Sequence, residues 1–167
     1  MKQFFFALLL TVCAVSSAFA QQYGHVNFGN LLSQMPDVKT AETSLQAYEK
    51  GEIATGEKMV ADFKKHYAET EARVGDMTPK QLEQEKAKLE KEQATIQQFE
   101  QGLSRKIELK RQELLGPIIK KAKDAVNAVA KEQGYQIVFD SSIFGSVLFA
   151  EDATDILPLV KGRLGIE

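Results

Sequence analysis

A seven-residue repeat of apolar side chains, set in a long polar segment, most constrains what this chain can fold into. Apolar residues at that spacing form one narrow stripe along a helix, which must face a partner helix as the seam of a coiled coil. Mixed lysine and glutamate residues between them are typical of a solvated helix face. The repeat consists of Leu82, Leu89, Ile96 and Leu103, with Phe99, Ile107 and Leu114 at intermediate positions.

Local signals mark both ends of the helix that carries this repeat. Thr78 can cap the helix with its hydroxyl, Pro79 suits the first helical position, and Gln81 can complete a capping box. Gly134 suits the left-handed conformation that commonly follows a helix. The sequence therefore predicts one helix from Pro79 to about Gln133.

A second long helix is predicted just before this one, from Asp37 to Val74. Pro36 fits the start of its first turn, and the helix would be about 57 Å long. Its apolar residues, at helical spacing, are Ala41, Leu45, Tyr48, Met59, Phe63, Tyr67 and Val74. Only the five residues from Gly75 to Pro79 connect the two helices, so they must run antiparallel. We expect a coiled-coil hairpin, which is an arm and not a compact globule.

Alternating apolar and polar residues near both ends of the chain predict β-strands. The alternating positions are Val26 and Phe28 in the first strand, Tyr135, Ile137 and Phe139 in the second, and Val147 and Phe149 in the third. Ser141 to Gly145 would link the last two strands as a hairpin. A short final helix is predicted after Thr154, with Pro158 in its first turn and Ile156, Leu157, Val160 and Leu164 on its apolar side.

The predicted fold class is therefore α+β, with the arm over residues 37–112 and a discontinuous β-rich body over residues 21–36 and 113–167. Three strands from one chain make a small sheet with exposed edges, which is marginal alone. We expect copies of the chain to complete it, so that the body is an oligomerisation body shared between subunits. Its predicted core and interface residues are Val26, Phe28, Ile137, Phe139, Val147 and Phe149.

Residues 1–20 have the layout of a secretory signal peptide. Lys2 precedes an apolar run, and Ala18 to Ala20 form a small-residue cleavage site, so cleavage is expected after Ala20. The apolar run is shorter than the roughly 20 residues of a membrane span. The alternative is a lipoprotein, in which Cys13 would carry the lipid. Val12 precedes this cysteine, however, where lipoproteins usually have a small residue. The mature chain then carries no cysteine and acts outside the cytoplasm.

Charge and composition disfavour several classes of function. The formal net charge is −2, and removal of Lys2 leaves 20 basic residues against 23 acidic ones. That balance disfavours a nucleic-acid binder and gives no support for contact with an anionic membrane surface. His25 and His66 lie far apart with no cysteine nearby, so no zinc spacing exists. We find no catalytic motif, no phosphate-binding glycine loop and no cofactor site, and expect no enzyme.

In the order of these elements the chain resembles the Skp/OmpH family of periplasmic chaperones. The resemblance covers the mature chain and includes the segments 26–29, 115–118, 125–130, 134–140 and 152–156. It implies a homotrimer, in which strands of three chains build the body and three hairpins surround a cavity. It also implies that unfolded outer-membrane β-barrel proteins are held there without ATP, in the periplasm. The strongly basic charge of well-known members is missing here, so no lipid-binding residue is carried over.

A holdase needs weak, adaptable contacts, for which thioether and aromatic side chains are suited. The candidate client contacts on the arm are Met59, Phe63, Tyr67, Met77 and Phe99, and the alternative interpretation of most of them is packing in the seam. Hinge candidates that could soften the arm are Gly51, Gly56, Gly102 and Pro117. The other function considered is a cell-envelope adaptor, whose hairpin tip docks on a transporter or another envelope partner.

Overall fold

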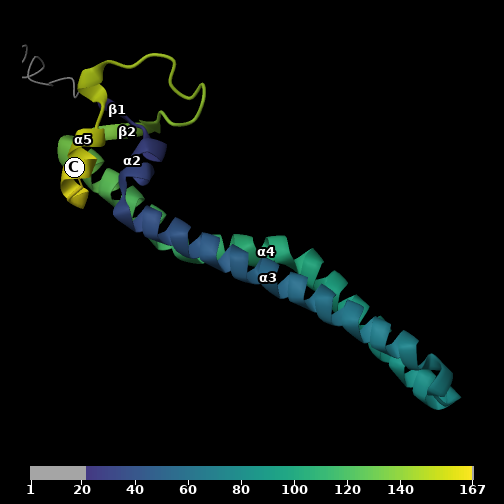
Figure 1. Ribbon diagram of the computed structural model, residues 1–167. Coiled ribbons are helices and arrows are strands. Elements are labelled where there is room, and N and C mark those ends of the chain that lie inside the picture. Colours follow the sequence, from purple (N-terminus) through teal and green to yellow (C-terminus); the bar gives the residue numbers. More distant parts are fainter. Residues whose placement is uncertain (1–21, 167) are drawn as a thin grey trace, which may run out of the picture. The chain divides into compact units, whose positions relative to one another are not determined.

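The structure is a computed structural model that describes residues 22–166, so the predicted signal peptide lies outside the described residues. The chain forms two units (Figure 1). One, here called the arm unit, comprises residues 32–123. The other, the body unit, comprises residues 22–31 and 124–166 among those described.

Two long helices, α3 (Pro36–Arg73) and α4 (Pro79–Gln133), run antiparallel in the arm unit (Figure 1). Ion pairs between them fix the direction. Lys121 lies 3.1 Å from Asp37, and Lys106 lies 3.0 Å from Glu52, so later residues of α3 meet earlier residues of α4. The predicted hairpin is confirmed, with bounds within one residue of those expected. Across residues 22–166, no helix combines the length and apolar content needed to cross a bilayer.

The seam of the hairpin is unevenly buried. Val38, Ala41 and Leu45 of α3 are buried near the start of that helix, and Ala122 of α4 is fully buried. The seven-residue repeat from Leu82 to Leu103 is only half-buried. Two helices cannot cover both sides of a seam, so apolar surface stays open along the outer part of the arm.

The tip of the hairpin is a short 3-10 helix, η1 (Val74–Asp76), followed by a capping box. The Thr78 backbone N–H donates to Gln81 Oε1 at 2.8 Å, and the Gln81 N–H donates to Thr78 Oγ1 at 3.3 Å. Each side chain thus satisfies a backbone group that the helix leaves unpaired. The start of α4 predicted from Thr78, Pro79 and Gln81 is confirmed.

The body unit is built on two parallel strands, β1 (Gln22–Val26) and β2 (Tyr135–Asp140). His25 pairs with Phe139 and Val26 with Asp140. Gly134, with φ of 78°, separates α4 from β2 as predicted. A single bridge joins His25 to Asp155 on the other side of β1, after the 3-10 helix η2 (Asp152–Thr154).

The core of the body unit lies around the last helix, α5 (Leu157–Leu164). Ile156 and Val160 are fully buried there, as the sequence predicted for this helix, and Val26 and Val129 are buried with them. Gly24 lets β1 approach closely, since a Cβ at this position would lie 3.2 Å from the Tyr135 ring and 3.3 Å from Ile156.

The expectation that Phe28 belongs to the first strand is wrong. Phe28 begins a helix, α2 (Phe28–Gln34), because Asn27 caps it: the Asn27 side-chain oxygen accepts the Asn30 backbone N–H at 2.8 Å. Asp140 holds the same turn, accepting the Phe28 N–H at 3.2 Å and the Ser142 N–H at 2.9 Å. Burial raises the pKa of Asp140, but these hydrogen bonds, with that of the Ser142 hydroxyl, lower it below its usual value.

The prediction of a third strand over Val147 and Phe149 is also wrong. Residues 141–150 form turns and irregular backbone, and Val147 and Phe149 belong to no strand. Ser141 to Gly145 therefore do not link a hairpin. Alternation makes a strand only when a neighbour accepts its hydrogen bonds, and within residues 22–166 no strand lies beside this segment. The sheet has two strands in place of three.

Candidate functional site

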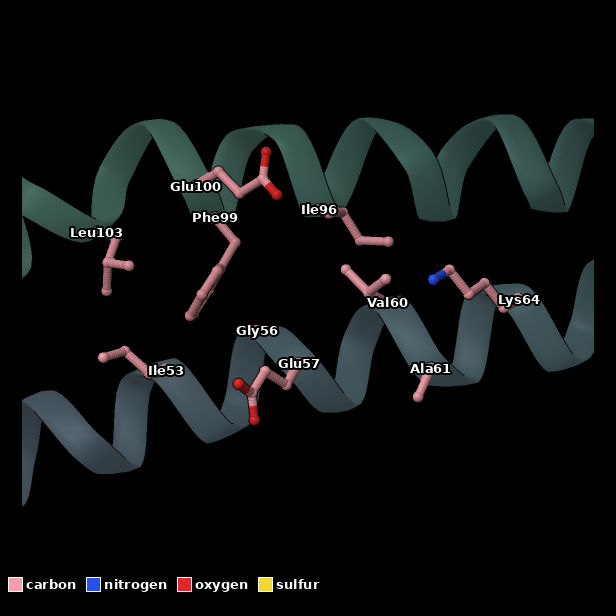
Figure 2. Close-up of a pocket in the computed structure, with 10 residues that line it drawn as sticks. All are labelled: Ile53, Gly56, Glu57, Val60, Ala61, Lys64, Ile96, Phe99, Glu100 and Leu103. Atoms are coloured by element: carbon pink, nitrogen blue, oxygen red, sulfur yellow. The ribbon is translucent and has the colours of Figure 1, made fainter.

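An apolar hollow of about 440 Å³ lies between α3 and α4 in the middle of the arm unit (Figure 2). The Phe99 ring of α4 points across it toward Gly56 of α3 (Figure 2), where a Cβ would lie 3.0 Å from Phe99 Cε1. Glycine therefore makes room for this ring. The other residues lining this first hollow are Ile53, Glu57, Val60, Ala61, Lys64, Ile96, Glu100 and Leu103.

A second hollow of about 450 Å³ follows toward the tip and shares Ile96 with the first. Met59, Phe63 and Ile96 supply its apolar surface. The polar residues lining this second hollow are Asp62, His66, Lys91, Glu92 and Thr95. Both hollows are shallow, and charged side chains lie beside their apolar ones. Such surfaces suit weak, transient contact with apolar segments of another polypeptide more than recognition of one small molecule.

The predicted client contacts take three different positions. Met59, Phe63 and Phe99 are half-buried in the hollows. Tyr67 is 54% exposed and lies beside Phe63, with 6.4 Å between ring centroids. Met77 is half-buried at the tip. The sequence-based list therefore mixes seam residues with one clearly exposed side chain, Tyr67.

Sequence reasoning missed two exposed apolar residues of the arm, Ile53 and Leu109, which are 51% and 56% exposed. Leu109 falls outside the seven-residue repeat, and that mismatch could have identified it as an off-seam residue. Ile53 lies at the edge of the first hollow, among residues that follow no clear repeat.

The four hinge candidates have different surroundings. A Cβ at Gly51 or Gly102 would meet nothing within 4 Å, whereas one at Gly56 would meet Phe99. Pro117 lies inside α4, whose helical range continues from Pro79 to Gln133. Space for a ring is thus a second reason for glycine at position 56, independent of flexibility.

Charged residues flank the apolar surface. Lys106 lies 4.7 Å from the centroid of the Phe99 ring, within the range of a cation–π contact, and also pairs with Glu52. Burial and a hydrogen bond with Glu52 raise the pKa of Tyr48 above its usual value.

Within residues 22–166, no three histidine, cysteine or acidic side chains are placed to hold a metal ion.

The six predicted body residues differ in exposure. Val26 is buried, and Phe28 and Val147 are half-buried. On β2, Ile137 and Phe139 are close to half exposed, and Phe149 is 84% exposed. Ile143, Phe144 and Leu148 are also exposed, so residues 143–149 form a cluster of apolar side chains open to solvent. We call this cluster the apolar loop.

Comparison with known proteins gives a family and a fold. A family model described as outer membrane protein (OmpH-like) matches residues 22–164. A solved structure of a candidate outer membrane chaperone (OmpH-like) from Caulobacter crescentus is similar, with a TM-score of 0.70 and 17% sequence identity. The match covers 85% of this chain and 82% of that one. No curated protein matches the sequence.

Proposed function

The chain belongs to the OmpH-like family of outer membrane proteins, and from that premise we propose that it is an ATP-independent holdase chaperone of the periplasm. It would bind unfolded outer-membrane β-barrel proteins and keep them from aggregating. The family match and the similar fold of a candidate outer membrane chaperone support a chaperone role. The signal-peptide layout of residues 1–20 supports the compartment.

The observation that carries this proposal is the half-buried seam of the arm unit. Its apolar and aromatic side chains lie in two shallow hollows on an otherwise charged hairpin. Such a surface offers many weak contacts and no single shaped pocket, as a binder of varied unfolded chains requires. At the tip, Met77 is half-buried and Val74 is 44% exposed, so an adaptor that docks by its tip would find fewer apolar side chains there than the two hollows offer.

We further propose that three copies assemble through their body units and enclose a client between their arms. The apolar loop and the outer face of β2 expose apolar side chains that a single chain leaves uncovered. Burial of such surface between copies is favourable at about 25 cal/mol per Å². Softening of the arms at Gly51 and Gly102 would then let the enclosed space adapt to the size of the client.

A mixing assay tests holdase function. A urea-unfolded β-barrel protein is diluted with the mature chain and without nucleotide, and aggregation is followed by light scattering. We expect scattering to fall at a stoichiometric ratio, and to fall less when Ile53 and Tyr67 are both replaced by serine. The matched control is Gln97→Ser, which removes an exposed polar side chain of α4. Scattering that stays unchanged with the wild-type chain contradicts the proposal.

A further inference from the structure

His66 of α3 lies between two carboxylates of α4 on the outer part of the arm unit. Its Nε2 is 2.9 Å from Glu85 Oε2, and its Nδ1 is 2.9 Å from Glu92 Oε1. The two glutamates stand seven residues apart, so they project from the same side of α4 two turns from each other. The side chains are partly shielded, with 26% of His66, 23% of Glu85 and 43% of Glu92 exposed.

The chemistry of the three groups decides which protonation state fits this arrangement. A neutral imidazole has one N–H donor and one nitrogen lone pair, whereas an ionised carboxylate can only accept. With carboxylates at both nitrogens, a neutral ring would turn a lone pair toward one of them. Only the imidazolium donates to both. We propose that His66, Glu85 and Glu92 form a proton-dependent clasp that fastens the outer parts of α3 and α4 together.

The other charged groups around the ring are consistent with this clasp. On α4, Lys88 lies 2.7 Å from Glu85 Oε1 and balances part of its charge, and Lys91 lines the same hollow as His66. On α3, Asp62 lines that hollow and is paired with Lys58 at 2.6 Å. Both ring nitrogens already face carboxylates from different turns of α4, so the group is a salt-bridge cluster and not a metal site.

The pKa directions set the pH range of the clasp. Hydrogen bonds with Glu92 and then Glu85 raise the pKa of His66 above 6.5, against the opposing effect of burial. Hydrogen bonds with Lys88 and then His66 lower the pKa of Glu85 below its usual value. The contribution of His66 is therefore complete below 6.5 and is lost as pH rises through its raised pKa. The contribution of Glu85 is lost only as pH falls through its lowered pKa.

Release of the clasp would loosen the apolar seam beside it. His66 and Glu92 line the second hollow together with Met59, Phe63 and Ile96. When the ring loses its proton as pH rises through the raised pKa of His66, one contact between the helices becomes repulsive, and this part of the seam opens more often. The helices are then held most tightly at pH values between the lowered pKa of Glu85 and the raised pKa of His66. This property belongs to the single hairpin, whether or not it holds a client.

Nuclear magnetic resonance titration of the mature chain tests the protonation state directly. The chain has two histidines, and His66→Gln identifies the signal of His66. We expect its midpoint to lie above 6.5 and to fall in Glu92→Gln and further in the Glu85→Gln, Glu92→Gln double variant. Glu113→Gln, which removes a carboxylate from an exposed pair with Lys110, is the matched control and should leave the midpoint unchanged. A midpoint at or below 6.5 that no glutamate variant moves overturns the clasp.

Hydrogen exchange then tests whether the cluster fastens the helices. Amides in residues 59–92 should exchange about threefold faster at roughly one pH unit above the measured midpoint of His66 than at roughly one unit below it, after correction for intrinsic rates, as expected of a partly exposed charged pair. His66→Gln should remove this pH dependence, and circular dichroism should show that the variant keeps its helices. Equal corrected rates at both pH values in the wild-type chain would show that no clasp acts.

Discussion

At the scale of single residues, Gly56 is the arm glycine at which a Cβ would meet another side chain, the ring of Phe99. The ring of Phe99 occupies space that any other residue at position 56 would fill with a Cβ. Phe99 is therefore held in the seam, and its face is also covered by Lys106. Of the predicted client contacts, Tyr67 has the greatest freedom to meet another chain, because it is exposed whereas the other four are half-buried.

Two glycine substitutions separate flexibility from fit. Gly51→Ala should raise the free energy of unfolding by up to about 1 kcal/mol, because alanine favours a helix interior and its Cβ meets nothing within 4 Å. Gly56→Ala should raise it less, or lower it, because the Phe99 ring must move. Urea unfolding followed by circular dichroism measures both.

The Gly56→Ala, Phe99→Leu double variant provides the control for this comparison. Loss of the ring should relieve the clash, so the effect of Gly56→Ala measured in the Phe99→Leu background should approach that of Gly51→Ala. Equal stabilisation by Gly51→Ala and Gly56→Ala in the wild-type background would contradict the proposed fit.

At the scale of elements, the structure shows which signals in the sequence are sufficient on their own. The start of α4 and its end before Gly134 follow from contacts within a few residues, and both were predicted correctly. The seam repeat likewise needs only helical geometry. In contrast, the alternation of Val26 and Phe28 predicts a strand through Phe28, whereas the side chain of Asn27 caps a helix that begins there.

The failure at Val147 and Phe149 has a different physical cause. A strand is stabilised by its neighbour, and the pattern of one segment does not say whether a neighbour exists. The hollows of the arm were unpredictable for a related reason. They depend on how far the two helices are offset along each other, and Phe99 facing Gly56 becomes visible only once that register is known.

The capping box at the tip gives a prediction at this scale. Thr78→Ala removes the hydroxyl that accepts the Gln81 N–H, and should lower the free energy of unfolding by about 1 kcal/mol. Thr78→Ser keeps the hydroxyl and should stay close to the wild type. Hydrogen exchange of amides in residues 80–83 would locate the effect, and unchanged exchange in Thr78→Ala would exclude a capping role.

At the scale of the whole molecule, the exposed apolar side chains of the body unit are the main unexplained surface of a single chain. Phe144 and Phe149 lie in the apolar loop with almost no cover from residues 22–166. Several exposed apolar side chains within one short segment favour an interaction site there. Assembly with further copies of the chain would cover them, as the proposed trimer requires.

Replacement of Phe144 and Phe149 by serine tests this assembly. The double variant should have a lower mass by light scattering after size-exclusion chromatography, because less apolar surface is buried between copies. Its helical signal should be unchanged, because neither residue lies in a helix. Leu109→Ser, at an exposed apolar position of the arm, should keep the mass of the wild type. A double variant that keeps the wild-type mass would contradict a role of the apolar loop in assembly.

The parallel pairing of β1 with β2 has a consequence for the order in which the chain acquires its structure. The N–H of Phe28 reaches Asp140 across 112 positions of sequence, whereas the hairpin joins segments that are neighbours around its tip. Contacts that close short loops form sooner than those that close long ones. A chain emerging from a ribosome or a translocon would thus form the hairpin of α3 and α4 before β1 can pair with β2. A product truncated before residue 135 lacks β2, so its β1 cannot form the sheet. Pairing of β1 with β2 therefore requires that the chain has been synthesised through residue 140.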